Sequence, residues 1–326
     1  MADNKIDIKE NYIRDIDSQL LEMLLLDRTT KKNIVWATND YSSHGLGYSA
    51  SDEISVFAIS GRRGSIIKPR IEKSKDEIRK RIKNKAEVFT PSWVCNAQNN
   101  LIDEAWFGYK YVFNVENNQT WLVNTEKITF PTIDGKTWQD YVKENRLEIT
   151  CGEAPYIVSR YDTVSGIIIP IKERIGLLDR KIRVINENVQ SDEEWLGWIK
   201  WAFKSVYAYD WQGDNVILAR ENLLFTFIDY YIDRYGIEPS KELLLDLTDI
   251  ITWNVWQMDG LKCVIPNSCH NESYVQYSLF GEEKIETICE GCSKNNIKKH
   301  NGVYCKIRDW KSNKTIRFVT LFGRKK

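Results

Sequence analysis

Apolar positions recur along the chain with two different periods, which predict helices and strands in different places. Within residues 1–32, apolar side chains from Ile13 to Leu24 recur every three or four positions and predict one amphipathic helix. Short runs of β-branched and aromatic residues predict strands at 33–37 and 54–59, with a loop rich in Ser and Gly between them. Longer helices are predicted at 92–106, 192–205, 215–231 and 243–255.

Strand-like and helical segments alternate between residues 147 and 265, which is typical of a parallel, doubly wound α/β sheet. One predicted strand carries Glu148 near its end, and another ends at Asp210. Ligands bind such sheets at the carboxyl ends of the strands, so both acids are candidate ligand-binding residues. For Asp210 the alternative is a helix cap or a surface acid.

The segment from Glu148 to Tyr156 predicts a strand, a tight turn and the start of a new element. Gly152 allows a positive φ or a close backbone approach, and Pro155 suits a first helical position. A turn of this kind points backbone N–H groups at whatever lies above the sheet. It is either a ligand cradle, with Ala154 in place of the usual second glycine, or an ordinary strand-to-helix turn.

Composition allows a large core and excludes a global attraction to polyanions. The 326 residues are 42% hydrophobic and include 12 Trp and 16 Tyr. Lys+Arg and Asp+Glu are 46 each, so a nucleic-acid site must be a local patch. The polar N-terminus carries no apolar signal segment, and no run of about 18 uncharged apolar residues predicts a membrane span. Seven cysteines, an odd number, favour the reducing cytoplasm and metal ligation over a disulfide framework.

A local basic patch does exist between Arg62 and Lys85, where eleven Lys and Arg residues accompany three acids. One interpretation is a solvated helix that turns Ile78 and Ile82 inward. The other is an edge that contacts nucleic-acid phosphates.

The C-terminal region carries a separate chemical signal. A Cys-x-x-Cys pair with outlying Cys and His predicts a zinc site, because thiolate and imidazole are the ligands zinc favours. We predict the ligands to be Cys269, Cys289, Cys292 and His300. Cys305 alternates with apolar residues along a predicted strand and is interpreted as a core thiol. Reduced, unliganded thiols are the alternative. The module also carries eight basic residues between Lys294 and Arg317, so it is a second candidate for nucleic-acid contact.

Four short segments in order resemble the adenine-specific DNA methyltransferases, the modification subunits of restriction systems. They are Phe89-Thr90-Pro91, Cys151-Gly152, Ala219-Arg220-Glu221-Asn222-Leu223 and Asp259-Gly260-Leu261. The family carries (Phe/Tyr)-Thr-Pro, Asp-Pro-Ala-Cys-Gly-Ser-Gly, an acid before Ala-Arg-x-Asn-Leu, and Asp-x-Leu. The resemblance covers residues 85–265.

The resemblance implies a Rossmann-like methyltransferase sheet that binds S-adenosylmethionine. By this comparison Phe89, Thr90 and Pro91 bind the cofactor, and the Thr90-Pro91 segment lies against its methionine part. Cys151 and Gly152 face its amino-acid end, with Glu148 or Glu153 near the ammonium group. Asp210 binds the ribose, and Asp259 contacts the adenine amine. Asp259 before Gly260 is also explained by turn chemistry alone.

The implied organisation is an N-terminal helical and β extension (1–85), a methyltransferase-like domain (86–265) and a zinc-knuckle-like module with the final strands (266–326). The family's catalytic (Asn/Asp/Ser)-Pro-Pro-aromatic loop is missing, because no Pro-Pro pair occurs in the chain. The nearest remnants are Thr38-Asn39-Asp40-Tyr41 and Asp309-Trp310, and the chain ends soon after Leu321.

Three functional hypotheses follow. The first is a DNA adenine methyltransferase or modification subunit. The second is a catalytically inactive, methyltransferase-like DNA-binding or assembly protein that needs a partner subunit. The third is an unrelated α/β protein stabilised by zinc.

Overall fold

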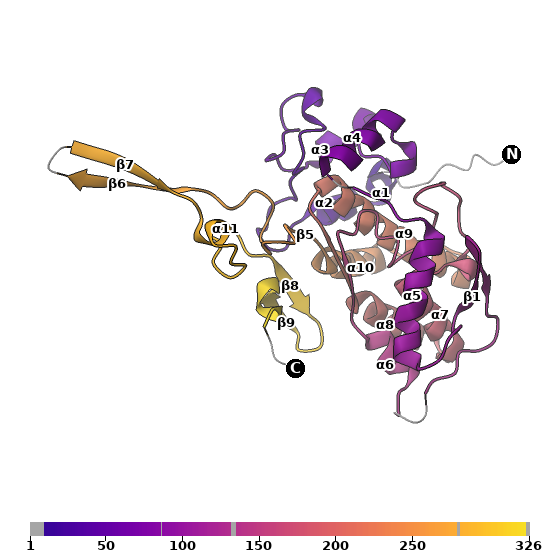
Figure 1. The fold of residues 1–326 in the computed structure, drawn as a ribbon. Helices are drawn as coiled ribbons and strands as arrows, with labels where there is room; N and C mark the ends of the chain where they lie inside the picture. The colour runs from indigo at the N-terminus through magenta and orange to yellow at the C-terminus, as the bar shows by residue number, and fades with distance from the viewer. Residues whose placement is uncertain (1–9, 86, 132–134, 279–280, 324–326) are drawn as a thin grey trace.

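A computed structural model describes residues 10–85, 87–131, 135–278 and 281–323 (Figure 1). These residues form eleven α-helices and four small sheets, which confirms the mixed α/β class. Within this described part, no helix is both long and apolar enough to cross a membrane.

The central sheet has three parallel strands in the order β3 (Arg146–Ile149), β4 (Val206–Asp210) and β5 (Val255–Gln257). Helices α7 (Leu177–Asn188) and α8 (Asp192–Lys204) connect β3 to β4. Two further helices, α9 (Gly213–Tyr235) and α10 (Lys241–Asn254), connect β4 to β5. Every residue of β4 is buried, as expected for the middle strand of a parallel sheet. The predicted alternation of strands and helices is therefore present in a narrow sheet.

The two faces of this sheet are covered differently. One face packs against α8, α9 and α10 in the main hydrophobic core. The other face carries Tyr207, Tyr209 and Trp256, which pack against C-terminal residues such as Phe318. The expectation of a doubly wound sheet, with helices on both faces, is therefore wrong for the described residues, because the C-terminal segment takes the place of the second helical layer.

The N-terminal region differs from its predictions in two places. The single expected helix is two helices, α1 (Glu10–Ile16) and α2 (Ser18–Leu25), because the Asp17 carboxylate caps α2 by accepting the Gln19 N–H at 2.7 Å. The strand predicted at 54–59 contains the helical turn α3 (Val56–Ile59), which Ser55 caps.

Residues 33–37 form only isolated β-bridges in place of the expected strand. The predicted helix at 243–255 stops at Asn254, and its last predicted residue opens β5.

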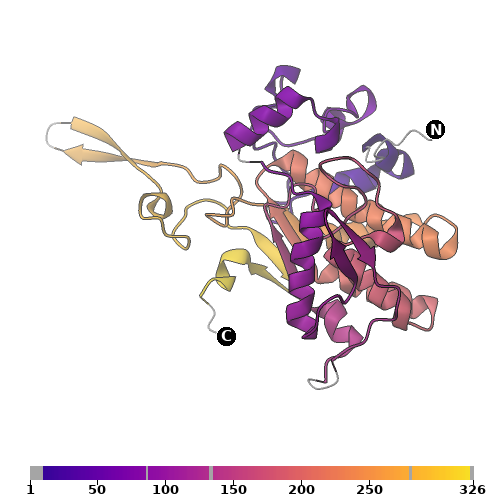
Figure 2. The same cartoon turned by 45° about the vertical axis from the view of Figure 1, so that its right-hand side comes forward.

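The remaining helices are α4 (Lys75–Lys85), α5 (Ser92–Phe107), α6 (Trp138–Lys143) and α11 (Glu290–Ser293). Short 3₁₀ turns lie at Ser42–His44, Gly61–Arg63, Arg70–Glu72, Ile171–Glu173 and Phe318–Leu321. Antiparallel hairpins are formed by β1 (Asn114–Asn117) with β2 (Thr120–Val123), β6 (Glu272–Ser278) with β7 (Gly281–Thr287), and β8 (Lys306–Asp309) with β9 (Lys314–Arg317). The β6–β7 hairpin extends away from the rest of the chain (Figures 1 and 2).

A buried arginine joins the N-terminal helices to the sheet. Arg220 on α9 donates to the carbonyls of Val255 at 2.8 Å and Leu26 at 3.1 Å, and also to that of Leu24. These carbonyls lie at the ends of α2 and α10, where no helical N–H is available to them. The guanidinium therefore connects α2, α9 and β5.

We expect Arg220→Met to lower the free energy of unfolding by about 3 kcal/mol, because the substitution leaves several buried carbonyls without a donor. Urea unfolding followed by circular dichroism measures the change. Arg62→Met, at an exposed position, is the control and is expected to stay within about 0.5 kcal/mol of the native chain. A loss below about 1 kcal/mol for Arg220→Met would contradict this role.

Candidate ligand cavity and metal centre

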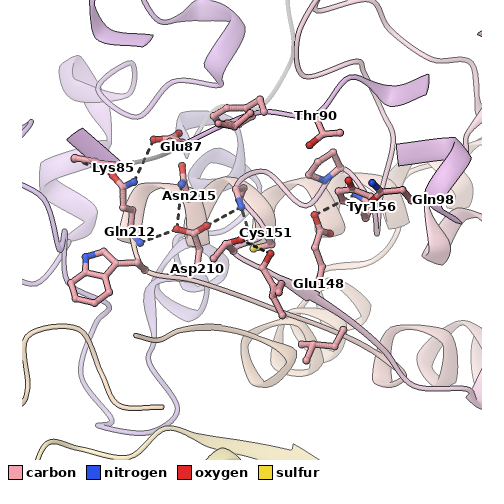
Figure 3. A pocket seen from close by; sticks show the side chains of 18 of the residues that line it. Lys85, Glu87, Thr90, Gln98, Glu148, Cys151, Tyr156, Asp210, Gln212 and Asn215 are labelled. Atoms are coloured by element: carbon pink, nitrogen blue, oxygen red, sulfur yellow. Dashed lines mark hydrogen bonds between the residues drawn. The ribbon is translucent and has the colours of Figure 1, made fainter. Parts of the chain in front are cut away.

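A cavity of about 830 Å³ lies at the carboxyl ends of β3 and β4 (Figure 3). Its volume falls within the range of small-molecule and cofactor sites, roughly 300–1,000 Å³. Six of the eight predicted cofactor residues line it: Phe89, Thr90, Glu148, Cys151, Gly152 and Asp210. The other two, Pro91 and Asp259, are not among its lining residues.

The turn after β3 has an unusual backbone. Thr150, Gly152 and Ala154 all have positive φ, at 48°, 53° and 61°. Only glycine adopts this conformation without a steric penalty, so Thr150 and Ala154 each carry strain of roughly 1 kcal/mol or more. Ala154 thus takes a glycine-like conformation at the position where the family pattern has its second glycine. This conformation of Ala154 cannot be predicted from the residue type, because alanine normally favours a helix.

Asp210 connects the ends of two strands. Its Oδ2 accepts the Gly152 N–H at 2.9 Å, and its Oδ1 accepts the N–H of Gln212 at 2.9 Å and the side-chain amide of Asn215 at 3.3 Å. Burial raises the pKa of Asp210 to about 6, although these hydrogen bonds oppose the shift. Near neutral pH it is an ionised acceptor at the wall of a ligand-sized cavity.

The resemblance implies that Glu148 or Glu153 lies near the ammonium group of the cofactor, and only Glu148 lines the cavity. Its carboxylate accepts the N–H groups of Tyr156 at 3.4 Å and Ile157 at 3.2 Å, and burial raises its pKa to about 8. Glu153 is engaged elsewhere, since its carboxylate accepts the Arg70 N–H at 2.5 Å and the Tyr161 hydroxyl at 2.6 Å.

Asp259 lies in the turn after β5. Its Oδ1 accepts the N–H groups of Leu261 at 3.0 Å and Lys262 at 3.2 Å, and the turn packs Gly260 against the ring of Tyr209. Tyr209 belongs to the sheet face that the C-terminal segment covers. The resemblance implies that Asp259 shares a cofactor site with Asp210, but Asp259 does not line the cavity, and the alternative, turn chemistry, explains this acid.

Pro91 immediately precedes α5, and its carbonyl accepts the N–H groups of Val94 and Cys95 at 2.9 and 3.1 Å. The helix begins at Ser92, as predicted, and Pro91 forms part of the helix start, while Phe89 and Thr90 reach the cavity.

The sequence interpretation missed a wall of the cavity formed by the end of α4 and the segment after it. Lys85 donates to Gln212 at 3.1 Å and also to Thr38 and Asp40. Gln212 in turn donates to Glu87 at 3.3 Å. Lys85 and Glu87 lie just before the Phe-Thr-Pro motif in the sequence, and this closeness is the signal that links the basic segment to the cavity.

Helix α4 is anchored by a buried charge. Arg81 is 5% exposed and lies 2.9 Å from the Asp214 carboxylate, which also accepts the Tyr41 hydroxyl at 2.7 Å. Burial alone raises the pKa of Asp214, but Arg81 and Lys73 outweigh it and hold that pKa well below the usual range. The expectation that Ile82 turns inward is wrong, since this side chain is 43% exposed.

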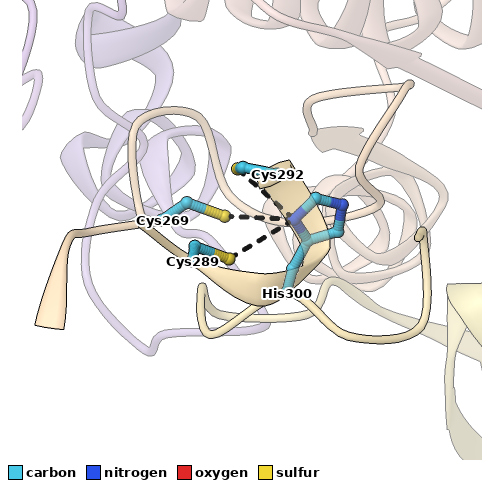
Figure 4. Close-up of side chains that lie close together, drawn as sticks. All are labelled: Cys269, Cys289, Cys292 and His300. Atoms are coloured by element: carbon cyan, nitrogen blue, oxygen red, sulfur yellow. Dashed lines mark hydrogen bonds between the residues drawn. The ribbon is translucent and has the colours of Figure 1, made fainter. Parts of the chain in front are cut away.

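The four predicted metal ligands converge at the base of the β6–β7 hairpin (Figure 4). The ligand atoms of Cys269, Cys289, Cys292 and His300 all lie within 4.8 Å of one another. The three Sγ atoms are 3.6, 3.7 and 3.6 Å from His300 Nδ1. Tetrahedral zinc bonded to sulfur and nitrogen implies about 3.5 Å between such ligand atoms. The group can therefore bind a metal ion such as zinc.

The other cysteines are placed apart from this group. Cys305 is fully buried in the hydrophobic cluster below the sheet, which confirms its interpretation as a core thiol. Among the described residues, all seven cysteines are free of disulfides.

Together these features define a mixed α/β protein with a ligand-sized cavity at the carboxyl ends of parallel strands and a separate Cys₃His group. Comparison of the chain with protein-family models, curated proteins and solved structures found no match.

We expect the chain to bind a single equivalent of Co²⁺, with the visible absorption of a tetrahedral thiolate site, and Zn²⁺ to displace it. Cys292→Ala is expected to abolish the absorption, because it removes one of the four ligands from an exposed position. Cys305→Ala is the matched control and is expected to retain it. Equal loss in both variants, or no tetrahedral absorption in the native chain, would contradict the assignment.

Proposed function

We propose that the cavity binds S-adenosylmethionine and that the protein is a DNA adenine methyltransferase or the modification subunit of a restriction system. The single observation that carries the proposal is the hydrogen bond from the Gly152 N–H to Asp210, 2.9 Å long, at the wall of the 830 Å³ cavity. It brings the glycine turn of one parallel strand to the acid at the end of the next. An acid in this position accepts hydrogen bonds from the ribose hydroxyls of a nucleoside cofactor.

The surroundings of Gly152 support the same assignment. A Cβ added at this position would lie 3.5 Å from the ring of Phe89, so the turn and the ring approach closely. Glu148 lies near the start of the same turn and supplies an acid for the ammonium group of the cofactor's methionine part. The roles of these residues come from the family resemblance, and their common cavity supports them.

A specific observation favours the second hypothesis, a methyltransferase-like protein that binds cofactor and DNA but needs a partner subunit. Among the described residues, β3 pairs only with β4, so its second edge is open. Leu147 and Ile149 on this strand are 48% and 60% exposed, and both line the cavity. An open edge with apolar side chains suits a strand from another polypeptide. The lack of a Pro-Pro pair agrees with a site that is incomplete without it.

Zinc is the metal we propose for the Cys₃His group, in a structural role. Four protein ligands leave no open position for a substrate, as is usual for structural zinc. The ion would tie Cys269, before β6, to Cys289, after β7, and so fix the base of the extended hairpin.

Isothermal calorimetry with S-adenosylmethionine tests cofactor binding, and we expect saturable binding that Asp210→Ala weakens by about tenfold or more, because a charge-assisted hydrogen bond is lost.

Tritiated methyl transfer to DNA then separates the two hypotheses. Transfer by the chain alone supports the first, and binding without transfer supports the second. If the native chain binds no S-adenosylmethionine, both hypotheses are rejected and only the third, an unrelated α/β protein, is left.

The affinity for S-adenosylmethionine is expected to fall as the pH drops through about 6. The pKa of Asp210 is raised to about 6, so the carboxyl becomes protonated below that pH and accepts ribose hydroxyls less well. The dissociation constant should rise by about tenfold between neutral pH and pH ~5. Calorimetry across this range measures the dissociation constant, and Asp210→Asn is the control that lacks the titration of Asp210 but keeps that of Glu148. A dissociation constant that is flat with pH in the native chain would exclude Asp210 from the binding contacts.

A further inference from the structure

The solvent side of α4 carries a row of basic residues. Lys75, Arg79 and Lys83 follow one another at four-residue intervals, so they lie along one side of the helix, and all are exposed. Lys80 is exposed beside them, and Arg81 points the opposite way into the buried pair with Asp214.

Little of this charge is neutralised within the protein. Among the residues that the structure describes, neither Lys80 nor Lys83 has a carboxylate within ion-pair distance. Arg79 lies 3.9 Å from Asp76, but both side chains are largely exposed, and such a pair contributes little. The row is therefore available to an external anion.

The helix that carries the row ends at the ligand cavity. Asn84 and Lys85, at the end of the helix, line the cavity, and the buried pair of Arg81 with Asp214 fixes the helix in that position. A polyanion lying along α4 would thus be guided to the opening of the cavity.

We propose that the exposed face of α4 (Lys75, Arg79, Lys80 and Lys83) contacts the phosphate backbone of duplex DNA and directs it to the cavity. This inference rests on the proposed function for the choice of DNA as the polyanion. The whole chain is neutral, so attraction to DNA requires a local field of this kind.

The other basic region, in the C-terminal module, suits the role less well. Lys294 and Lys299 both pair with Glu290, at 3.0 and 2.7 Å. The neighbouring β6–β7 hairpin exposes Glu272 and Glu282, which repel phosphates. We therefore assign the backbone contact to α4 and not to the tail.

The test is fluorescence anisotropy with a labelled DNA duplex of mixed sequence, without S-adenosylmethionine, over a series of salt concentrations. Lys80→Gln combined with Lys83→Gln is expected to weaken binding by about tenfold or more and to reduce the salt slope by roughly 2. Lys127→Gln combined with Lys172→Gln removes the same charge from exposed positions elsewhere, and is expected to leave binding within about twofold of the native chain.

Equal weakening by both pairs of substitutions would show a non-local charge effect and overturn the proposal. So would a native chain that binds no duplex, or one that binds RNA or anionic vesicles more tightly than the duplex. Cofactor calorimetry on the same variants separates this outcome from failure of the proposed function, because the α4 face does not line the cavity. Cofactor binding with unchanged DNA affinity in the α4 variant would reject the surface alone.

Discussion

The candidate site depends on the parallel pairing of β3 with β4. In this register Ile149 lies beside Tyr209, and the pairing continues where the Cys151 N–H donates to the Tyr209 carbonyl at 3.0 Å. The turn after β3 therefore stands beside the end of β4, and the Gly152 N–H can reach Asp210. A shift of the register by one residue would turn Asp210 to the other face of the sheet and separate the two halves of the site.

Local sequence signals identified much of this arrangement in advance. The sequence predicts Asp210 at a strand end, because an apolar run precedes it and a long helix follows, and both features depend on residues close in the sequence. The four metal ligands were found for a similar reason, since a Cys-x-x-Cys pair restricts the neighbouring ligands to loops that can reach it. In both cases the chemistry of the side chain and the short-range pattern point to the same conclusion. The metal, the cofactor and the nucleic acid stay predictions.

The features that could not be predicted from the sequence are those that depend on contacts between residues far apart in the chain. Nothing near Arg81 indicates that this arginine is buried and the neighbouring Ile82 exposed, because the burial is stabilised by Asp214, more than a hundred residues away. A charged side chain is buried only where an opposite charge pairs with it, and the periodicity of apolar residues does not predict such a pair. The cofactor role predicted for Asp259 depends on a distant residue in the same way. Its position near the end of β5 matches the methyltransferase pattern, but the packing of Gly260 on Tyr209 sets the direction of the following turn.

Asp210 and Asp214, four residues apart, have opposite pKa shifts because different groups face them. Asp210 accepts hydrogen bonds from neutral donors only, and burial dominates, so its pKa rises to about 6. Asp214 is even more deeply buried but faces Arg81 and Lys73, and these cations hold its pKa below the usual range. The charge of Asp214 is therefore committed to anchoring α4, which closes one wall of the cavity. Among the described residues, no Lys, Arg or His forms an ion pair with Asp210, whose carboxylate lies at the cavity wall. The two carboxylates therefore differ in their partners: Asp214 is neutralised by cations, whereas the described donors to Asp210 are neutral N–H groups, so Asp210 is the acid whose charge a hydroxyl donor in the cavity would meet.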